Sequence, residues 1–78
     1  MTITPAQCKE ARRVLGWSGE ELAHTAGVSR NAVGYFERGQ RASRPETLAA
    51  IIGALEAAGV EFTTNEPGVR LLRREDAP

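Results

Sequence analysis

The first apolar stripe of the chain lies near its N-terminus and has the spacing of one helix face. Four residues repeat at i, i+3, i+4 and i+7: Cys8, Ala11, Arg12 and Leu15. Thr4 and Gln7 have the spacing of a capping box, with Pro5 at the first helical position. Gly16 is suited to end the helix that this pattern predicts. The apolar face includes the charge of Arg12, which needs a partner.

A second capping pattern predicts a short helix directly afterwards. Ser18 and Glu21 have the spacing of a capping box, and the acidic residues of this turn lie at the positive end of the helix dipole. Three apolar residues supply the inner face: Leu22, Ala23 and Ala26. Gly27 tolerates a positive φ, so we expect the helix to last about two turns before the chain changes direction.

The third predicted helix has two faces of opposite character. Ser29 is its N-cap, and Gly39 ends it. Val33 and Phe36 are the apolar positions of the inner face. The remaining face is polar and rich in hydrogen-bond donors: Arg30, Asn31, Gly34, Tyr35 and Arg38. This second face does not contribute to the hydrophobic core, which makes it a candidate binding surface.

Opposite charges lie on the inner stripes of the first and third helices. Glu37 follows Val33 by four residues and shares its face, as Arg12 shares the apolar face of the first helix. Removing a charge from water is costly unless an opposite charge is close to it. We therefore predict that Arg12 and Glu37 form a structural ion pair between the two helices.

Pro45 predicts the start of a fourth helix after a loop at residues 40–44. Its core stripe again has helical spacing: Leu48, Ile51, Ile52 and Leu55. Its other side carries small residues: Ala50, Gly53, Ala54 and Ala57. A helix that is apolar all round is expected to be covered on both faces, and Gly59 ends it.

The pattern changes to alternation beyond the fourth helix. Residues 60–63 and 69–71 alternate with period two, and Pro67 and Gly68 are turn residues between them, so we predict a β-hairpin. Two strands alone are marginal in water, so we expect the hairpin to dock on the helices or on another subunit, with the small-residue side of the fourth helix as the candidate surface. The predicted divisions are a helical domain at residues 1–59, a hairpin for docking or dimerisation at 60–74, and a flexible tail at 75–78.

Length and composition restrict the class of protein. The 78 residues are 41% hydrophobic and 26% charged, which is typical of one globular domain. The longest apolar stretch, Leu48 to Leu55, is far shorter than the roughly 20 residues of a membrane span. The single cysteine, Cys8, and the lack of a signal-peptide pattern favour a reducing, cytoplasmic location. A chain this small has little margin of stability, so we expect a homodimer.

The sequence offers no pattern for catalysis or for a cofactor. It contains no Gly-rich phosphate loop, nucleophile–base pair or paired carboxylates, so we predict that the chain is not an enzyme and has no cofactor. His24 lies three residues after Glu21 and four after Glu20. One imidazole and two carboxylates are too few for a closed metal site, so we predict no metal.

The net charge is zero, but its distribution along the chain is uneven. Residues 28–45 carry four arginines against one glutamate, a local charge of +3. Residues 46–66 carry four glutamates and no lysine or arginine. The excess of basic charge therefore lies in the segment that contains the third predicted helix and the loop after it.

Two short helices joined by a glycine-containing corner, the second with an uncommitted polar face, are the layout of a helix-turn-helix, and residues 18–39 have this layout. The most informative residues are Arg12, Glu21-Leu22-Ala23, Ala26-Gly27-Val28-Ser29, Val33 and Phe36-Glu37-Arg38-Gly39. In these, over roughly residues 6–58, the sequence resembles the phage Cro/repressor-type (XRE-type) helix-turn-helix regulators. The resemblance implies a mainly α fold, a compact four-helix, lambda-repressor-like bundle, here followed by the C-terminal β-hairpin.

The resemblance also implies a function and roles for individual residues. The family acts as dimers that regulate transcription on inverted-repeat operators in double-stranded DNA. Its base-reading positions correspond to Arg30, Asn31 and Tyr35. Its phosphate-contacting positions correspond to Ser18, Arg38, Gln40, Arg41, Ser43 and Arg44. Arg12 and Glu37 correspond to the internal ion pair of the family.

The sequence departs from the family pattern at three points. Gly19 stands where many members have a glutamine that supports the recognition helix or touches DNA. Gly34 weakens its helix by about 1 kcal/mol relative to alanine, and either permits a close approach to the groove or has no role. The hairpin replaces an additional helix that many members use to dimerise. Gly19 and the zero net charge keep an alternative open. It is a helix-turn-helix-derived interaction module, such as an antiactivator or an antitoxin-like adaptor, that uses the small-residue side of the fourth helix and the hairpin to bind a heterologous protein instead of DNA.

Overall fold

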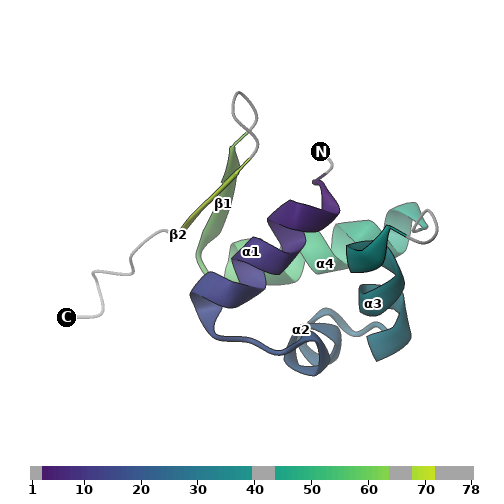
Figure 1. The fold of residues 1–78 in the computed structure, drawn as a ribbon. Coiled ribbons are helices and arrows are strands. Elements are labelled where there is room, and N and C mark those ends of the chain that lie inside the picture. The colour runs from purple at the N-terminus through teal and green to yellow at the C-terminus, as the bar shows by residue number, and fades with distance from the viewer. Residues whose placement is uncertain (1–2, 40–43, 64–67, 72–78) are drawn as a thin grey trace.

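The computed structural model describes residues 3–39, 44–63 and 68–71. Within them the chain forms, in order, α1 (Pro5–Leu15), α2 (Gly19–Ala26), α3 (Arg30–Arg38), α4 (Pro45–Ala57), β1 (Val60–Thr63) and β2 (Gly68–Leu71). The strands extend from the end of α4 and lie beside α1, whereas α3 lies on the other side of the bundle (Figure 1). The predicted helical bundle with a C-terminal hairpin is confirmed. In the described ranges, no helix is long and apolar enough to cross a bilayer.

Local capping interactions set the helix ends where the sequence predicts them. Thr4 Oγ1 accepts a hydrogen bond from the backbone N–H of Gln7 at 3.0 Å, and Gln7 Oε1 accepts one from the N–H of Thr4 at 2.9 Å. Ser18 and Glu21 make the same reciprocal pair at the start of α2. Gly27, at the corner between α2 and α3, has a φ of 74°, a left-handed conformation that glycine adopts without strain. The helix-turn-helix layout therefore follows from local chemistry.

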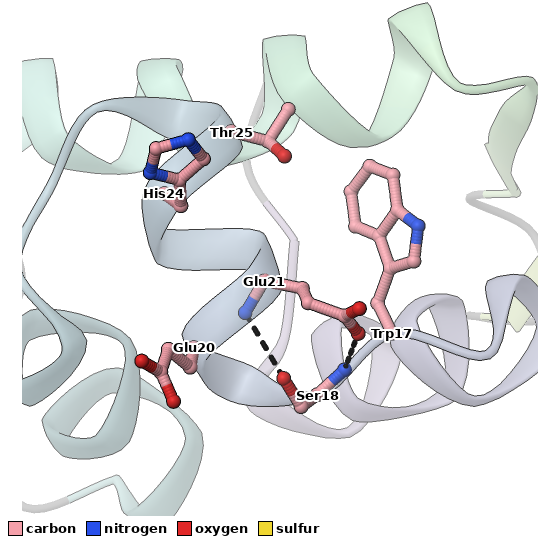
Figure 2. Close-up of a pocket in the computed structure, with 6 residues that line it drawn as sticks. All are labelled: Trp17, Ser18, Glu20, Glu21, His24 and Thr25. Carbon is pink, nitrogen blue, oxygen red and sulfur yellow. Dashed lines mark hydrogen bonds between the residues drawn. The ribbon is translucent and has the colours of Figure 1, made fainter.

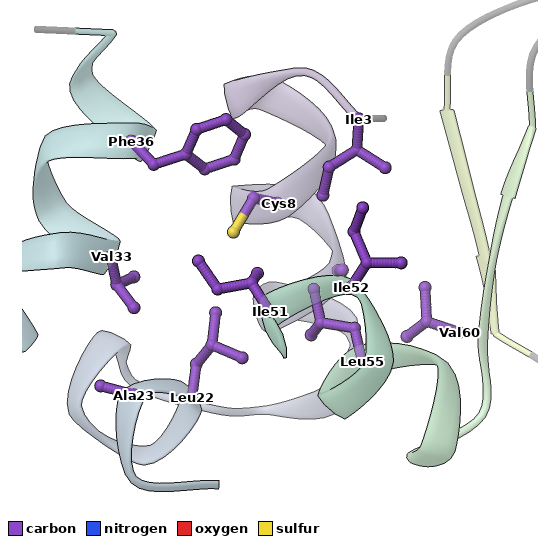
Figure 3. Close-up of a cluster of buried hydrophobic side chains, with 11 residues drawn as sticks. Ile3, Cys8, Leu22, Ala23, Val33, Phe36, Ile51, Ile52, Leu55 and Val60 are labelled. Carbon is purple, nitrogen blue, oxygen red and sulfur yellow. The ribbon is translucent and has the colours of Figure 1, made fainter. Parts of the chain in front are cut away.

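Apolar side chains from all the described helices and from β1 meet in one core (Figure 3). Ile51 and Leu55 of α4 are completely buried, with 0% of their surface exposed. Leu22 of α2 and Val33 of α3 pack around them. The helices thus bury the stripes that their patterns predict.

The hairpin is antiparallel, with a register that runs from Val60 opposite Leu71 to Thr63 opposite Gly68. Gly68, predicted as a turn residue, belongs to β2, so this strand begins earlier than the alternation indicates. The rest of the predicted turn, residues 65–67, lies outside the described residues. So do residues 72–78, which include the predicted tail.

The hairpin docks on the helices, as predicted, but mainly on α1 and not on the small-residue side of α4. β2 packs against α1, and β1 contacts α4 and contributes Val60 to the core. Nε2 of Gln7 donates hydrogen bonds to the carbonyl oxygens of Thr63 at 3.1 Å and Gly68 at 2.9 Å. Gln7 is 6% exposed, so burial of its amide depends on these acceptors, and one side chain ties both strands to α1. On α4, Gly53 and Ala57 stay exposed.

Candidate nucleic-acid interface

The two sides of α3 have the opposite character that the sequence predicts. Val33 and Phe36 are buried in the core, and α1 and α2 pack against this inner side. Arg30, Asn31 and Arg38 are exposed, and Tyr35 and Gly34 are partly exposed between them. We call the surface of these last five residues the outward face of α3. Figure 1 shows α3 away from the hairpin, so the molecule's own strands do not cover it.

The inner side of α3 is held by the predicted pair of charges. Arg12 Nη2 lies 2.8 Å from Glu37 Oε1, and Arg12 Nε donates to Oε2 at 2.8 Å, so the contact is bidentate. Arg12 Nη1 donates to the carbonyl oxygen of Trp17 at 3.0 Å. The Glu37 side chain is 8% exposed and that of Arg12 is 22% exposed. The pair therefore joins α3 to α1 and to the segment that leads into α2.

Cys8 is a third member of this contact, which the sequence pattern does not reveal. Its Sγ donates to Glu37 Oε2 at 3.0 Å. Burial, followed by this hydrogen bond, raises the pKa of the Cys8 thiol, so the group stays protonated and acts as a donor. Burial also acts to raise the pKa of Glu37, but hydrogen bonds from Arg12 and Cys8 outweigh it, and the pKa lies below its ordinary value. Glu37 is thus an ionised carboxylate that holds α3 against α1.

The residues assigned to phosphate contact lie at the starts of α2 and α4, in the last turn of α3 and in the segment between α3 and α4. Ser18 is exposed at the start of α2, where its Oγ accepts from the N–H of Glu21 and keeps its own hydroxyl proton for donation. Arg44 is exposed at the N-cap position of α4. Arg38 is exposed at the last turn of α3, with its Cζ 5.7 Å from the ring centroid of Tyr35. Three further candidates lie outside the described residues: Gln40, Arg41 and Ser43.

The start of α2 borders the outward face of α3. Glu20 Oε1 lies 3.9 Å from Arg30 Nη1, with both side chains largely exposed. This contact joins two helices, so no spacing within either helix reveals it. Gly19 faces the inner side of α3, because a Cβ atom there would lie 4.0 Å from Val33 Cγ1. The position therefore touches the third helix even though it has no side chain.

A hollow of about 680 Å³ lies along α2 (Figure 2). Its lining comes from the turn before α2 and from one side of the helix: Trp17, Ser18, Glu20, Glu21, His24 and Thr25. The two carboxylates give it acidic character, so it does not extend the basic surface of α3. In the part of the chain that the structure describes, no group of three or more His, Cys, Asp or Glu side chains is arranged to hold a metal ion.

Comparison with known proteins agrees with this geometry. A family model described as helix-turn-helix matches residues 9–61, which are 53 of the 78 residues. The match includes α2, the glycine corner and α3, and it extends into β1. A search of curated proteins found no match.

Proposed function

The chain belongs to the XRE-type helix-turn-helix family of DNA-binding regulators, and from this premise we propose that it regulates transcription as a cytoplasmic homodimer on an inverted-repeat operator. One observation carries the proposal: the outward face of α3 is polar, donor-rich and uncovered, while its inner face supplies the core. Folding uses only one side of this helix. The other side has the shape and chemistry to enter a major groove.

Three side chains of the outward face are proposed to read bases. Arg30 is suited to guanine, to which a guanidinium donates two hydrogen bonds, and Asn31 is suited to adenine. Tyr35 offers a hydroxyl group and a ring edge that fits a thymine methyl group. Arg30 and Asn31 occupy the first turn of α3, the part of a recognition helix that reaches base edges.

The phosphate contacts are proposed to position this helix rather than to select sequence. Ser18 and Arg44 are exposed beside the two ends of the motif, and Gln40, Arg41 and Ser43 belong to the segment between α3 and α4. Contacts of this kind release condensed counterions, so affinity should fall steeply as salt rises. They set the register of the protein on the duplex and carry no sequence information by themselves.

Selection of bound sequences from random duplex DNA tests the proposal. A homodimer should enrich an inverted repeat with half-site centres about 34–36 Å apart, one helical turn of DNA. A gel shift at moderate salt with the DNA upstream of the protein's own gene should give a discrete band. Failure to enrich any sequence, together with no discrete band, would reject the regulator function.

The small-residue side of α4, which is only partly covered, favours a second candidate function. Gly53 and Ala57 are exposed there, and Gly19 lacks a side chain at the edge of the motif. A helix-turn-helix-derived module could use this side of α4 to bind a heterologous protein. Stoichiometric co-purification of such a protein, with no sequence enriched from random DNA, would favour this second function over the first.

A further inference from the structure

Gly34 lies in the middle of the outward face of α3. Asn31, Gly34, Tyr35 and Arg38 fall at i, i+3, i+4 and i+7, so they follow one another along one stripe of the helix. A Cβ atom at Gly34 would lie 3.0 Å from Arg38 Nη1 and 3.4 Å from Arg38 Nη2. The guanidinium of Arg38 therefore lies directly over the backbone of Gly34.

The Arg38 side chain is folded back along α3. Its Cζ is 5.7 Å from the Tyr35 ring centroid, within the range of a cation–π contact. Side chains on a helix lean toward its N-terminus, which lets residue 38 reach back one turn to residue 34. The positive charge of Arg38 is thereby moved from the end of the helix toward the centre of the outward face.

Backbone conformation does not explain a glycine at position 34. Gly34 lies inside α3, whereas Gly27 and Gly39 at helix ends have left-handed φ values of 74° and 67°. A glycine inside a helix is less stable than an alanine. Gly53 occupies a similar position in α4, and none of the described atoms outside its own helix backbone comes within 4 Å of the place of its Cβ. Of the two, Gly34 is the one that makes room for a side chain.

We propose that Gly34 seats the Arg38 guanidinium at the centre of the outward face, so that Arg38 reads a guanine of the operator instead of contacting a phosphate. The inference rests on the proposed function, because it assigns a base to a residue on the face that meets DNA. A guanidinium donates two parallel hydrogen bonds to O6 and N7 of guanine. Contact with Tyr35 restricts the side chain before binding, which reduces the rotamer entropy lost in the complex. Arg38 is then a specificity-determining residue and Gly34 its positioning residue.

Selection of half-sites from random duplex DNA tests the role of Arg38, with base preference measured position by position. Arg38→Ala should lower the preference for guanine at one position by about tenfold or more. Arg38→Lys keeps the positive charge and loses the planar pair of donors. It should therefore retain most of the overall affinity and lose the same base preference.

Gly34→Ala tests whether Gly34 positions the Arg38 guanidinium, and Gly53→Ala is its matched control. Both substitutions place a methyl group inside a helix and should raise the thermal midpoint. At position 34 the displaced atoms are the end of a flexible side chain, so the variant should fold. Gly34→Ala should lose the guanine preference, whereas Gly53→Ala should keep it. In an Arg38→Ala background, Gly34→Ala should change the preference no further.

Four results would overturn the inference. An equal loss of affinity for all sequences in Arg38→Ala would make Arg38 a phosphate contact. If Gly34→Ala keeps the guanine preference, Gly34 does not position Arg38. The same conclusion follows if Gly34→Ala still changes the base preference in the Arg38→Ala background. If the wild-type protein selects no sequence at all, the proposed function fails, and the inference fails with it.

Discussion

Helices α3 and α4 each bury one side and expose the other, yet their exposed sides differ in chemistry. The outward face of α3 carries two arginines, an asparagine and a tyrosine around Gly34. The exposed side of α4 carries small residues and two carboxylates: Glu46, Ala49, Gly53, Glu56 and Ala57. A chain of zero net charge thus keeps a basic face on α3, because the exposed acids that the structure describes lie on other helices and on β1. Net charge alone therefore says little about whether such a domain binds DNA.

The buried sides of the two helices differ as well. The inner stripe of α4 is apolar, with Ile51 and Leu55 completely buried. The inner side of α3 combines Val33 and Phe36 with the carboxylate of Glu37. The position of α3 therefore depends on a charged contact, which has defined geometry and responds to pH, whereas that of α4 depends on packing.

The largest change in stability is expected when the charged contact that anchors α3 is removed. Glu37→Ala leaves the Arg12 guanidinium without its carboxylate and should lower the free energy of unfolding by about 3 kcal/mol. Glu56→Ala, which removes a carboxylate from the exposed side of α4, should change it by less than about 0.5 kcal/mol. Urea unfolding of both variants measures the difference. Equal losses would show that the charged contact does not anchor α3.

Acid should remove the same contribution without a mutation. The folded-state pKa of Glu37 lies below its ordinary value of 4.5. Its contribution to stability is therefore complete above pH 4.5 and is lost as the pH falls through the lower, folded-state pKa. Wild type should lose stability more steeply than Glu37→Gln in this acidic range, and the gap between them should narrow. Parallel curves of unfolding free energy against pH would contradict this expectation.

A second comparison is between Arg30, which is proposed to contact a base, and Arg44, which is proposed to contact phosphate. Arg30→Ala should cost about 1–3 kcal/mol of binding to the selected operator and relax the preference at one base pair. Arg44→Ala should weaken binding to all sequences alike and lower the slope of log affinity against log salt by about one. Fluorescence anisotropy over a salt series measures both effects. If Arg30→Ala also weakens all sequences alike, Arg30 contacts phosphate rather than a base.

The helix ends and core stripes are predictable from sequence because their determinants are local. Thr4 with Gln7, and Ser18 with Glu21, lie within one turn, so each pattern contains both partners. The contact between α1 and α3 is predictable for a different reason. Each of its two charges falls on an otherwise apolar stripe, and such a charge needs a partner.

The remaining features depend on how the elements meet in space. Gln7 serves as a helix cap by pattern, but its donors reach carbonyl groups 56 and 61 residues away, which no local spacing reveals. The hairpin therefore docks on α1 rather than on α4. The seating of Arg38 over Gly34 depends on side-chain direction, and the contact of Glu20 with Arg30 depends on how two helices cross.

The smallest effect is expected from Glu20, the acidic neighbour of the outward face of α3. Its Oε1 lies 3.9 Å from Arg30 Nη1 in an exposed contact. Such a contact adds little to folding, but under the proposed function the carboxylate would compete with DNA for Arg30 and repel nearby phosphates. We expect Glu20→Gln to tighten operator binding by about twofold to fivefold.

Salt and a matched control separate this local effect from a change in net charge. The gain from Glu20→Gln should be greatest at low ionic strength and should fade as added salt screens the carboxylate. Glu56→Gln removes the same charge from the exposed side of α4 and should give no comparable gain. If both variants gain equally in anisotropy titrations, binding responds to total charge. The separation of basic and acidic faces on α3 and α4 would then contribute nothing to DNA recognition.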